Sequence, residues 1–419
     1  MNFSSSDTNP LDPAIASGDL ERNPYPIYAQ LRRDHPILRS ERWNCWVLSR
    51  HEEVAAVLKD TDHFSSVGRV VRSLHRELSP EEQEEVRPLI DHYSSGLINS
   101  DPPDHTRMRK LVQGSFSPRT LKQLKPQVAD IVDELLDRAE ATGKIEAVEN
   151  FTFQVPVRVI AEMMGVPVSM RERFKEWSVE TTEFMATPRP TLEVARRSQK
   201  ALLELRSFFA GQFEERRQQP GEDVISLLVS ATDEGEKLTE EELQSTCVTI
   251  LIGGHETTTS LLASALWILA GDPDLRSHMR NHPDEWPAFV EEVLRMEPPF
   301  QRILRVVNEP TEILGQRMEA GDSVMLLLGS ANRDENVFEE PDTFRPDRGS
   351  RKHVSFGHGI HVCLGAGLAR LEAPIALQRF VERFPEFYAE SDTPAWHDGM
   401  IRGLTRLPLR LNGASGSGA

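Results

Sequence analysis

Apolar residues recur at three- and four-residue spacing along most of the chain between residues 104 and 300. This spacing puts them on one face of an α-helix, which has 3.6 residues per turn, and it predicts a succession of amphipathic helices. The clearest segments are DHTRMRKLVQGSF at 104–116, LKPQVADIVDELLDRAEAT at 124–142 and VARRSQKALLELRSFFAGQFEERRQQP at 194–220.

Short apolar runs with strand character lie on both sides of this helical region. CWVLS at 45–49 stands between two predicted helices, and strand-like pieces return within 302–328. A last helix, predicted over 363–384, leads to the extended run LPLRL at 407–411. The pattern predicts a fold class that is mainly α with small β-sheets at one side.

One predicted helix is unusually long and has glycines in its interior. Thr239 can cap its start, with Glu242 three residues later completing a capping box. A helix from there to Gly271 would be about 50 Å long and would cross the whole domain. Gly253 and Gly254 each cost about 1 kcal/mol relative to alanine. Helix packing would account for one glycine, whereas two, followed by His-Glu-Thr-Thr, favour a functional site.

The chain has 419 residues, 38% hydrophobic and 27% charged, which is an ordinary globular composition. No Gly/Ser-rich or Pro-rich linker divides it, so we predict a single domain over 24–411. Residues 1–23 are expected to form an N-terminal extension. The low-complexity end, 412–419, is expected to be a disordered tail.

The formal charge of −18 is spread over solvated helix faces and argues against a nucleic-acid partner. The apolar segment 246–271 carries His255 and Glu256 near its middle, so a helix in a large core is a better interpretation than a membrane span. The first residues have no basic and apolar regions typical of a signal peptide. Three widely separated cysteines suit a reducing compartment, and we expect a cytoplasmic location.

Cys363 stands between a glycine-rich loop and the start of the last helix. A thiolate there would receive backbone N–H groups and the positive end of the helix dipole, which suits a metal ligand. Cys45 and Cys247 are interpreted as small buried hydrophobes. His358 and His361 do not make a zinc site with Cys363, because no second cluster completes it, and the loop lacks the spacing of a phosphate loop.

The loop FGHGIHVCLG at 356–365 resembles the haem-binding loop of the cytochromes P450, F-x-x-G-x-H-x-C-x-G, at every fixed position. The matching residues are Phe356, Gly359, His361, Cys363 and Gly365. The resemblance implies the cytochrome P450 fold, with the long central helix over haem b. It also implies that Cys363 is the axial thiolate, that His361 binds a haem propionate and that Phe356 packs beside the sulfur.

Three further motifs resemble the family's in order and spacing, and the first is a pair of charged residues. Glu292 and Arg295 of EEVLR match its E-x-x-R ion pair, a structural network that Arg348 would join. A surface pair at this spacing is the commoner alternative for the motif alone.

IGGHETT resembles the oxygen-binding stretch of the family's central helix, where Gly253 and Gly254 would leave room over the iron. Glu256 and Thr257 would then form an acid–alcohol pair that relays protons. The alternative for Thr257 is a hydroxyl bonded to its own helix backbone. His255 is expected to be structural.

The resemblance also implies the groups that hold the haem carboxylates. His105 and Arg109 lie four residues apart on one helix face, and Arg305 matches a third propionate-binding position. Arg107 and Lys110 are interpreted as a solvated basic face that could dock an acidic ferredoxin.

The resemblance places the substrate pocket at Ile250, Ile303, Met400 and Ile401, with walls from a loop between about Ser65 and Ser100 and from the segment 181–190. These residues are mainly apolar, so the expected substrate is a hydrophobic or amphipathic small molecule.

The expected activity is that of a haem-thiolate monooxygenase, which inserts one oxygen atom from O₂ into the substrate. Electrons would come from NAD(P)H through a separate ferredoxin or flavodoxin-type donor and its reductase, because no such module follows Phe380. We expect a monomer. A peroxygenase driven by H₂O₂ is the alternative enzyme, and a haem-thiolate sensor is the alternative outside catalysis.

Overall fold

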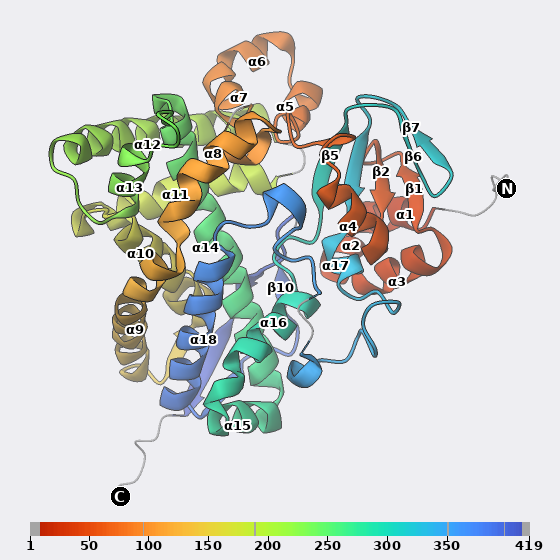
Figure 1. Ribbon diagram of the computed structural model, residues 1–419. Coiled ribbons are helices and arrows are strands. Elements are labelled where there is room, and N and C mark those ends of the chain that lie inside the picture. Colours follow the sequence, from red (N-terminus) through yellow and green to blue (C-terminus); the bar gives the residue numbers. More distant parts are fainter. Residues whose placement is uncertain (1–8, 95, 188–189, 350–351, 398, 413–419) are drawn as a thin grey trace, which may run out of the picture.

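The computed structural model describes residues 9–94, 96–187, 190–349, 352–397 and 399–412. Helices dominate, and the small sheets lie mostly to one side, which confirms the predicted fold class (Figure 1). The α-helices are α1 (Leu11–Ser17), α2 (Asp19–Arg22), α3 (Tyr25–Asp34), α4 (His51–Lys59), α5 (Arg72–Glu77), α6 (Pro80–Glu85), α7 (Arg87–Tyr93), α8 (Asp104–Gln113), α9 (Pro118–Glu140), α10 (Gln154–Met163), α11 (Arg171–Ala186), α12 (Leu192–Gln218), α13 (Val224–Ser230), α14 (Glu240–Gly271), α15 (Pro273–Asn281), α16 (Trp286–Met296), α17 (Leu328–Ala331) and α18 (Ala366–Arg383).

Helix α14 runs through the middle of the molecule, with α10, α12 and α18 packed against it (Figure 1). Its N-cap is Thr239, whose side chain accepts from the backbone N–H of Glu242 while the Glu242 carboxylate accepts from Thr239 N. The predicted capping box and the predicted end at Gly271 are therefore confirmed. Buried residues occur on every side of the helix, which explains why the segment is apolar enough to suggest a membrane span. No described helix meets the length and hydropathy needed to cross a membrane.

A five-stranded sheet forms one wall of the interior, in the order β1-β2-β8-β5-β3. Strands β2 and β8 are parallel, and the other neighbouring pairs are antiparallel. The remaining strands form a three-stranded sheet, β4-β12-β9, and two hairpins, β6-β7 and β10-β11. The strands are β1 (Ile37–Ser40), β2 (Cys45–Leu48), β3 (Phe64–Ser65), β4 (Lys144–Glu146), β5 (Ile303–Val307), β6 (Thr311–Ile313), β7 (Gln316–Met318), β8 (Ser323–Leu326), β9 (Glu386–Ala389), β10 (Ala395–Trp396), β11 (Leu404–Arg406) and β12 (Pro408–Asn412).

The segment interpreted as an N-terminal extension contributes two helices, α1 and α2. Leu11 and Leu20 from these helices are buried in a cluster with Tyr28 of α3 and Val47 of β2. The described part of the segment is thus packed on the edge of the sheet. Of the predicted tail, only Asn412 lies within the described residues, as the last residue of β12.

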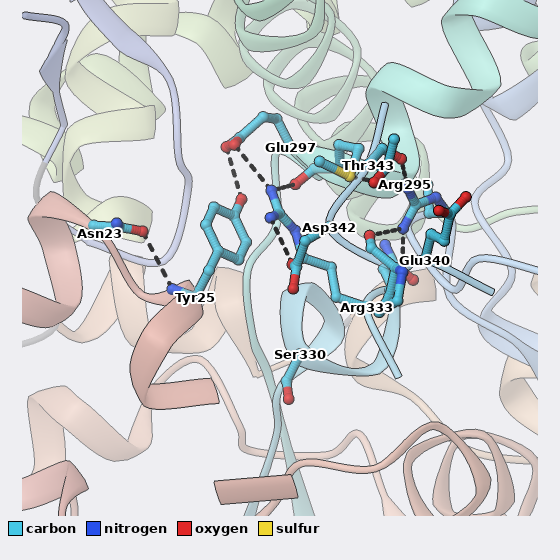
Figure 2. Close-up of polar contacts among 12 residues, drawn as sticks. Asn23, Tyr25, Arg295, Glu297, Ser330, Arg333, Glu340, Asp342 and Thr343 are labelled. Atoms are coloured by element: carbon cyan, nitrogen blue, oxygen red, sulfur yellow. Dashed lines mark hydrogen bonds and ion pairs between the residues drawn. The ribbon is translucent and has the colours of Figure 1, made fainter. Parts of the chain in front are cut away.

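The end of α16 is fixed by a buried ion-pair network. Arg295 is fully buried and pairs with Glu292 at 2.7 Å, and Arg348 approaches the same carboxylate at 3.3 Å. Arg295 also donates to the carbonyl oxygens of Pro341 and Thr343, so the irregular segment after α17 is held against α16 (Figure 2).

A second network joins α3 to the same region. The Tyr25 hydroxyl donates to Glu297 at 2.7 Å, and Arg333 bridges Glu297 and Asp342 (Figure 2). Arg402 donates to Glu297 as well, at 2.9 Å. This ties the chain around 400 to the end of α16.

Candidate functional site

A cavity of about 1150 Å³ opens between α14, the loop before α18, and β5. It brings together residues that are up to 386 positions apart in the sequence, from Ile15 to Ile401. The residues singled out in the sequence that line it are His105, Arg109, Ile250, Gly253, Gly254, Thr257, Ile303, Arg305, Phe356, His361, Cys363, Met400 and Ile401.

The loop that carries Cys363 is held close to the end of α4. Gly359 has φ +69°, and a Cβ on it would lie 2.5 Å from the Leu58 carbonyl oxygen, so only glycine fits there. The Cys363 N–H donates to Phe356 O at 2.8 Å, which folds the loop back on itself. The Arg370 guanidinium covers Phe356 at 4.4 Å from the ring centroid.

The Cys363 sulfur faces the cavity and is enclosed by protein. Solvent reaches Cys363 through the cavity. The surrounding protein nevertheless buries the sulfur, and this burial raises the pKa of the thiol. The backbone N–H groups of Gly365 and Ala366, together with Arg109, lower the pKa of the Cys363 thiol. A metal cation bound at the sulfur would favour the thiolate further, because positive charge stabilises the anion.

A group of basic side chains lies beside this loop with polar atoms unsatisfied. Both ring nitrogens of His105 and Nε2 of His361 are buried without a hydrogen-bond partner, and the two rings are 4.3 Å apart. Burial lowers the pKa of Arg305 to about 9, and the nearby arginines and His105 add to the burial that lowers the pKa of His361 to about 2. Unpaired buried cations and donors of this kind need an anionic partner.

Arg69 belongs to this basic group, although nothing in the sequence singled it out. It is buried, its Nε has no partner, and burial lowers its pKa to about 10. It lies close enough to Arg305 and His361 to lower the pKa of each. The sequence offers one sign of this role, because Arg69 is the single charged residue in the run VGRVV at 67–71. That sign is too weak to assign a role to the residue.

Charge balance in the group points to a dianionic ligand. Arg69, Arg109 and Arg305 contribute three positive charges, and Asp101, which acts on Arg305 and His105, contributes one negative charge. Asp101 is already used by Ser65 and by the backbone N–H of Ser66. Two carboxylates would neutralise the remaining charge, and haem b carries two propionates. The donors and the space therefore fit haem b.

The two glycines of α14 have different surroundings. A Cβ on Gly253 would meet nothing within 4 Å, so this position keeps open space in the cavity. A Cβ on Gly254 would lie 2.5 Å from Ile160 Cδ1, the mobile end of a side chain on α10. Gly254 is therefore explained by helix packing as well as by the cavity that it lines.

Thr257 lines the cavity one turn after Gly253, and its hydroxyl donates to the Gly253 carbonyl at 2.9 Å. Glu256 is not among the described residues that line the cavity; it is partly buried, and burial raises its pKa. The acid and the alcohol are thus adjacent in sequence, but only the alcohol faces the cavity.

His255 is fully buried and is held by Ser178 and the Leu251 carbonyl. Burial lowers its pKa to about 4, so the ring is neutral at neutral pH. Glu256 lies 3.5 Å from it, but a neutral imidazole makes no ion pair with that carboxyl group.

Arg107 and Lys110, which were expected to form a solvated basic face, are instead neutralised within the chain. Arg107 pairs with Glu242 and approaches Glu236, and Lys110 pairs with Asp233 at 3.3 Å. This face of α8 therefore offers little free positive charge, because acids from the segment before α14 and from the first turn of α14 pair with it. The sequence could not show this, since the partners lie more than 120 positions away.

Several elements line the part of the cavity away from Cys363, with mostly apolar side chains. Phe184 and Thr187 contribute from the segment at 181–190, of which 188–189 lie outside the described residues. Ile401 is bridged to Phe300, and Gln301 N donates to the Met400 carbonyl at 3.2 Å. The loop at 65–100 contributes Arg69, Val70 and Leu97 among others.

Comparisons with known proteins agree with this geometry. The family model "Cytochrome P450" matches residues 43–410. A putative cytochrome P450, YjiB, of Bacillus subtilis is 36% identical over 394 residues, which cover 93% of this chain and 94% of that protein. A biotin biosynthesis cytochrome P450 of the same organism is 37% identical over 377 residues, covering 89% of this chain and 92% of that protein.

Solved structures show the same fold. P450BioI, in complex with an acyl carrier protein ligated to hexadec-9Z-enoic acid, aligns with a TM-score of 0.87 at 34% identity, covering 94% of this chain and all of that one, 100%. CYP109E1 from Bacillus megaterium in complex with testosterone aligns with a TM-score of 0.82 at 34% identity, covering 93% of this chain and 99% of that chain.

Proposed function

Because the chain belongs to the cytochrome P450 family, we propose that it inserts one oxygen atom from O₂ into a hydrophobic or amphipathic organic molecule. It is an enzyme of the monooxygenase class that binds haem b and uses O₂ as co-substrate. The observation that carries the proposed reaction is the position of Thr257, whose hydroxyl lines the same cavity as the Cys363 sulfur.

The chain provides both the ligand and the cradle for the cofactor. Cys363 would bind the iron, and His105, Arg109, Arg305 and His361, joined by Arg69, would hold the propionates. Bound haem supplies the activation of O₂. The protein supplies the thiolate, a largely apolar cavity and a route for protons.

The route for protons is proposed to run from Glu256 to Thr257. Burial raises the pKa of Glu256 above its ordinary value, which favours the protonated form of the carboxyl group and makes it a better proton donor for a relay. Thr257 accepts that proton and delivers its own into the cavity, where its hydroxyl is exposed. Glu256 has to turn toward the cavity for this transfer, directly or through water.

A matched pair of variants tests the proposal. Thr257→Ala is expected to lower the product formed per O₂ consumed by about ten- to a hundredfold, the usual contribution of positioned proton transfer being at least that large. Thr259→Ala is the control, because Thr259 makes the same helix bond, to His255 O at 2.8 Å, but is not among the described residues that line the cavity.

The measurement is product yield against O₂ uptake with a surrogate ferredoxin and reductase. Equal coupling in the two variants would contradict the proposed role of Thr257. Replacing O₂ and reductant by H₂O₂ tests the peroxygenase alternative, which requires faster turnover in that arm and no effect of Thr257→Ala.

Electrons are proposed to come from a separate ferredoxin or flavodoxin-type protein and its reductase. The family model that matches residues 43–410 is that of the cytochrome P450 domain, so this proposal assigns electron delivery to other proteins. The apolar ligands bound by relatives, testosterone in CYP109E1 and a hexadecenoyl chain in P450BioI, support a hydrophobic or amphipathic substrate.

A further inference from the structure

The charge of the cavity is opposite to the charge of the chain. The protein has 66 acidic and 48 basic residues, a formal charge of −18. The described residues that line the cavity include seven arginines but a single carboxylate, Glu21. A positive cavity in an acidic protein indicates that negative charge is bound inside it.

The cradle for the haem carboxylates uses only three of these arginines. The other four are Arg42, Arg72, Arg76 and Arg302, and they come from the hairpin turn between β1 and β2, from α5 and from the start of β5. Arg42 and Arg76 are exposed, so this end of the cavity is its mouth. Helix α5 and the β1–β2 hairpin lie toward the outside of the molecule, away from α18 (Figure 1).

Two of the four arginines at the mouth are neutralised by carboxylates. Arg302 approaches Glu21 at 3.8 Å and lies over the Trp43 ring at 4.8 Å. Arg76 pairs with its neighbour Glu77 at 2.7 Å. These two side chains therefore add little net charge.

The other two, Arg42 and Arg72, have no carboxylate partner among the described residues. Arg72 donates to the Gly321 carbonyl at 3.1 Å and to Ser323 Oγ at 3.2 Å, which orients its guanidinium without neutralising it. Arg42 makes no hydrogen bond or ion pair within the described part of the chain. Both side chains line the cavity.

The turn that carries Arg42 is held in place by α1. Asp12 accepts from Ser40 Oγ and, at 3.0 Å, from the backbone N–H of Glu41. Asn44 closes the turn with φ 50°, its N–H donating to Glu41 O at 3.2 Å. Arg42 therefore projects from a fixed backbone, which lowers the entropy cost of binding a ligand there.

Between the mouth and Cys363 the cavity walls are apolar, with Ile250, Ile303 and Met400 among the lining residues. We propose that the substrate is an amphiphile with an anionic oxygen head group, carboxylate or phosphate, held at the mouth by Arg42 and Arg72 while its apolar chain extends toward Cys363. Arginine suits both head groups because its planar guanidinium forms paired hydrogen bonds with two oxygens. The inference rests on the proposed function, since it names the substrate class for that cavity.

The test is a spectral titration of the ferric haem protein, whose spin state reports displacement of water by a bound chain. The probes are tetradecanoic acid, tetradecyl phosphate and the neutral methyl tetradecanoate. We expect the acid, the phosphate or both to bind at least about fivefold more tightly than the ester, the effect of one favourable charge pair near the surface. Raising the ionic strength should weaken binding of the anionic probe alone.

Arg42→Gln is expected to weaken binding of the anionic probe about fivefold and to leave binding of the ester unchanged. Arg42→Lys should retain part of the affinity, because it keeps the charge and loses the planar fork. Arg280→Gln is the matched control, since Arg280 is an exposed residue of α15 that does not line the cavity.

Tighter binding of tetradecanoic acid than of tetradecyl phosphate identifies a carboxylate as the head group of the substrate. Tighter binding of tetradecyl phosphate identifies a phosphate. Equal affinity for the ester and both anions, or an Arg42→Gln variant that binds the anion as wild type does, overturns the inference. Failure of the proposed function looks different. In that case the anion still binds through Arg42, but no probe is oxidised with O₂ and reductant.

Discussion

Buried polar atoms without partners mark two different kinds of residue in this protein. The histidines and Arg69 in the cradle line a cavity, where a ligand can satisfy them. Glu372 on α18 also has both carboxylate oxygens unpaired, but it is fully buried and is not among the described residues that line the cavity. The first group indicates a binding site, whereas Glu372 is a structural acid whose pKa is raised by burial.

Arg69→Met tests the charge balance of the cradle. Removing one of three arginines leaves a propionate without a charged donor, a loss worth about 1.5–3 kcal/mol. We expect the variant to release haem at least about tenfold faster in a transfer assay to apomyoglobin. Arg107→Met is the control, because Arg107 is ion-paired outside the cradle. Equal haem release in the two variants would show that Arg69 does not contact the cofactor.

Glu372→Gln tests the buried acid through the pH dependence of stability. Burial raises the pKa of Glu372 well above its usual value, so the folded state keeps a proton that the unfolded state loses above about pH 4.3. The wild-type free energy of unfolding should therefore fall as pH rises from about 4.3 to the raised pKa of Glu372 in the folded protein, by about 1.4 kcal/mol per pH unit. Glutamine does not titrate, so the stability of the variant relative to wild type should increase with pH in thermal unfolding. A difference that is constant with pH would mean that Glu372 is ionised in the folded protein.

The motif around Cys363 could be read from the sequence because its residues are local. Phe356, Gly359 and His361 all lie within seven positions of the cysteine, and the loop folds through their own backbone bonds. Arg69 could not be found in this way, since its environment is made by residues near 100 and 305. The same holds for the neutralisation of Arg107 and Lys110 by distant acids.

At the scale of elements, long helices with marked ends were predictable and short strands were less so. Helix α14 was predictable because its sequence contains a capping box and a long helical pattern. The sheets bring together strands such as β2 and β8, which are separated by almost 280 residues, and no local pattern encodes such a pairing. The two-residue strands β3 and β10 have no periodicity to detect.

Arg295→Met tests the element-level role of the network behind α16. The substitution leaves the Glu292 charge buried with Arg348 as its remaining charged partner, and removing one partner of a buried pair costs about 3–5 kcal/mol. We expect a clear drop in the thermal unfolding temperature. The double variant Glu292→Gln/Arg295→Met should be less destabilised than the single one, because it has no uncompensated charge. A double variant that unfolds at the lower temperature would show that packing of Arg295, rather than its charge, holds the element.

At the scale of the whole molecule, the acidic surface and the basic cavity have separate roles. The net charge of −18 favours a negative exterior, while seven of the described arginines line one internal space that has a single carboxylate among its described lining residues. The mouth of that space is built by α1, the β1–β2 hairpin and α5, which are distant from the central helix (Figure 1). Residues 9–23, the described part of the segment interpreted from the sequence as an extension, therefore border the mouth of the cavity.

Leu20→Ala tests whether this segment is part of the folded body. Leu20 is 1% exposed, and truncating a buried leucine costs about 2–5 kcal/mol where the surroundings cannot collapse. Asp19→Ala is the control in the same helix, since Asp19 is exposed and solvent screens its pair with Arg22. We expect Leu20→Ala to lower the unfolding temperature and, because Asp12 in the preceding helix positions the Arg42 turn, to weaken binding of the anionic probe. If both variants unfold at the wild-type temperature, residues 9–23 fold independently of the domain, and the mouth of the cavity is formed without them.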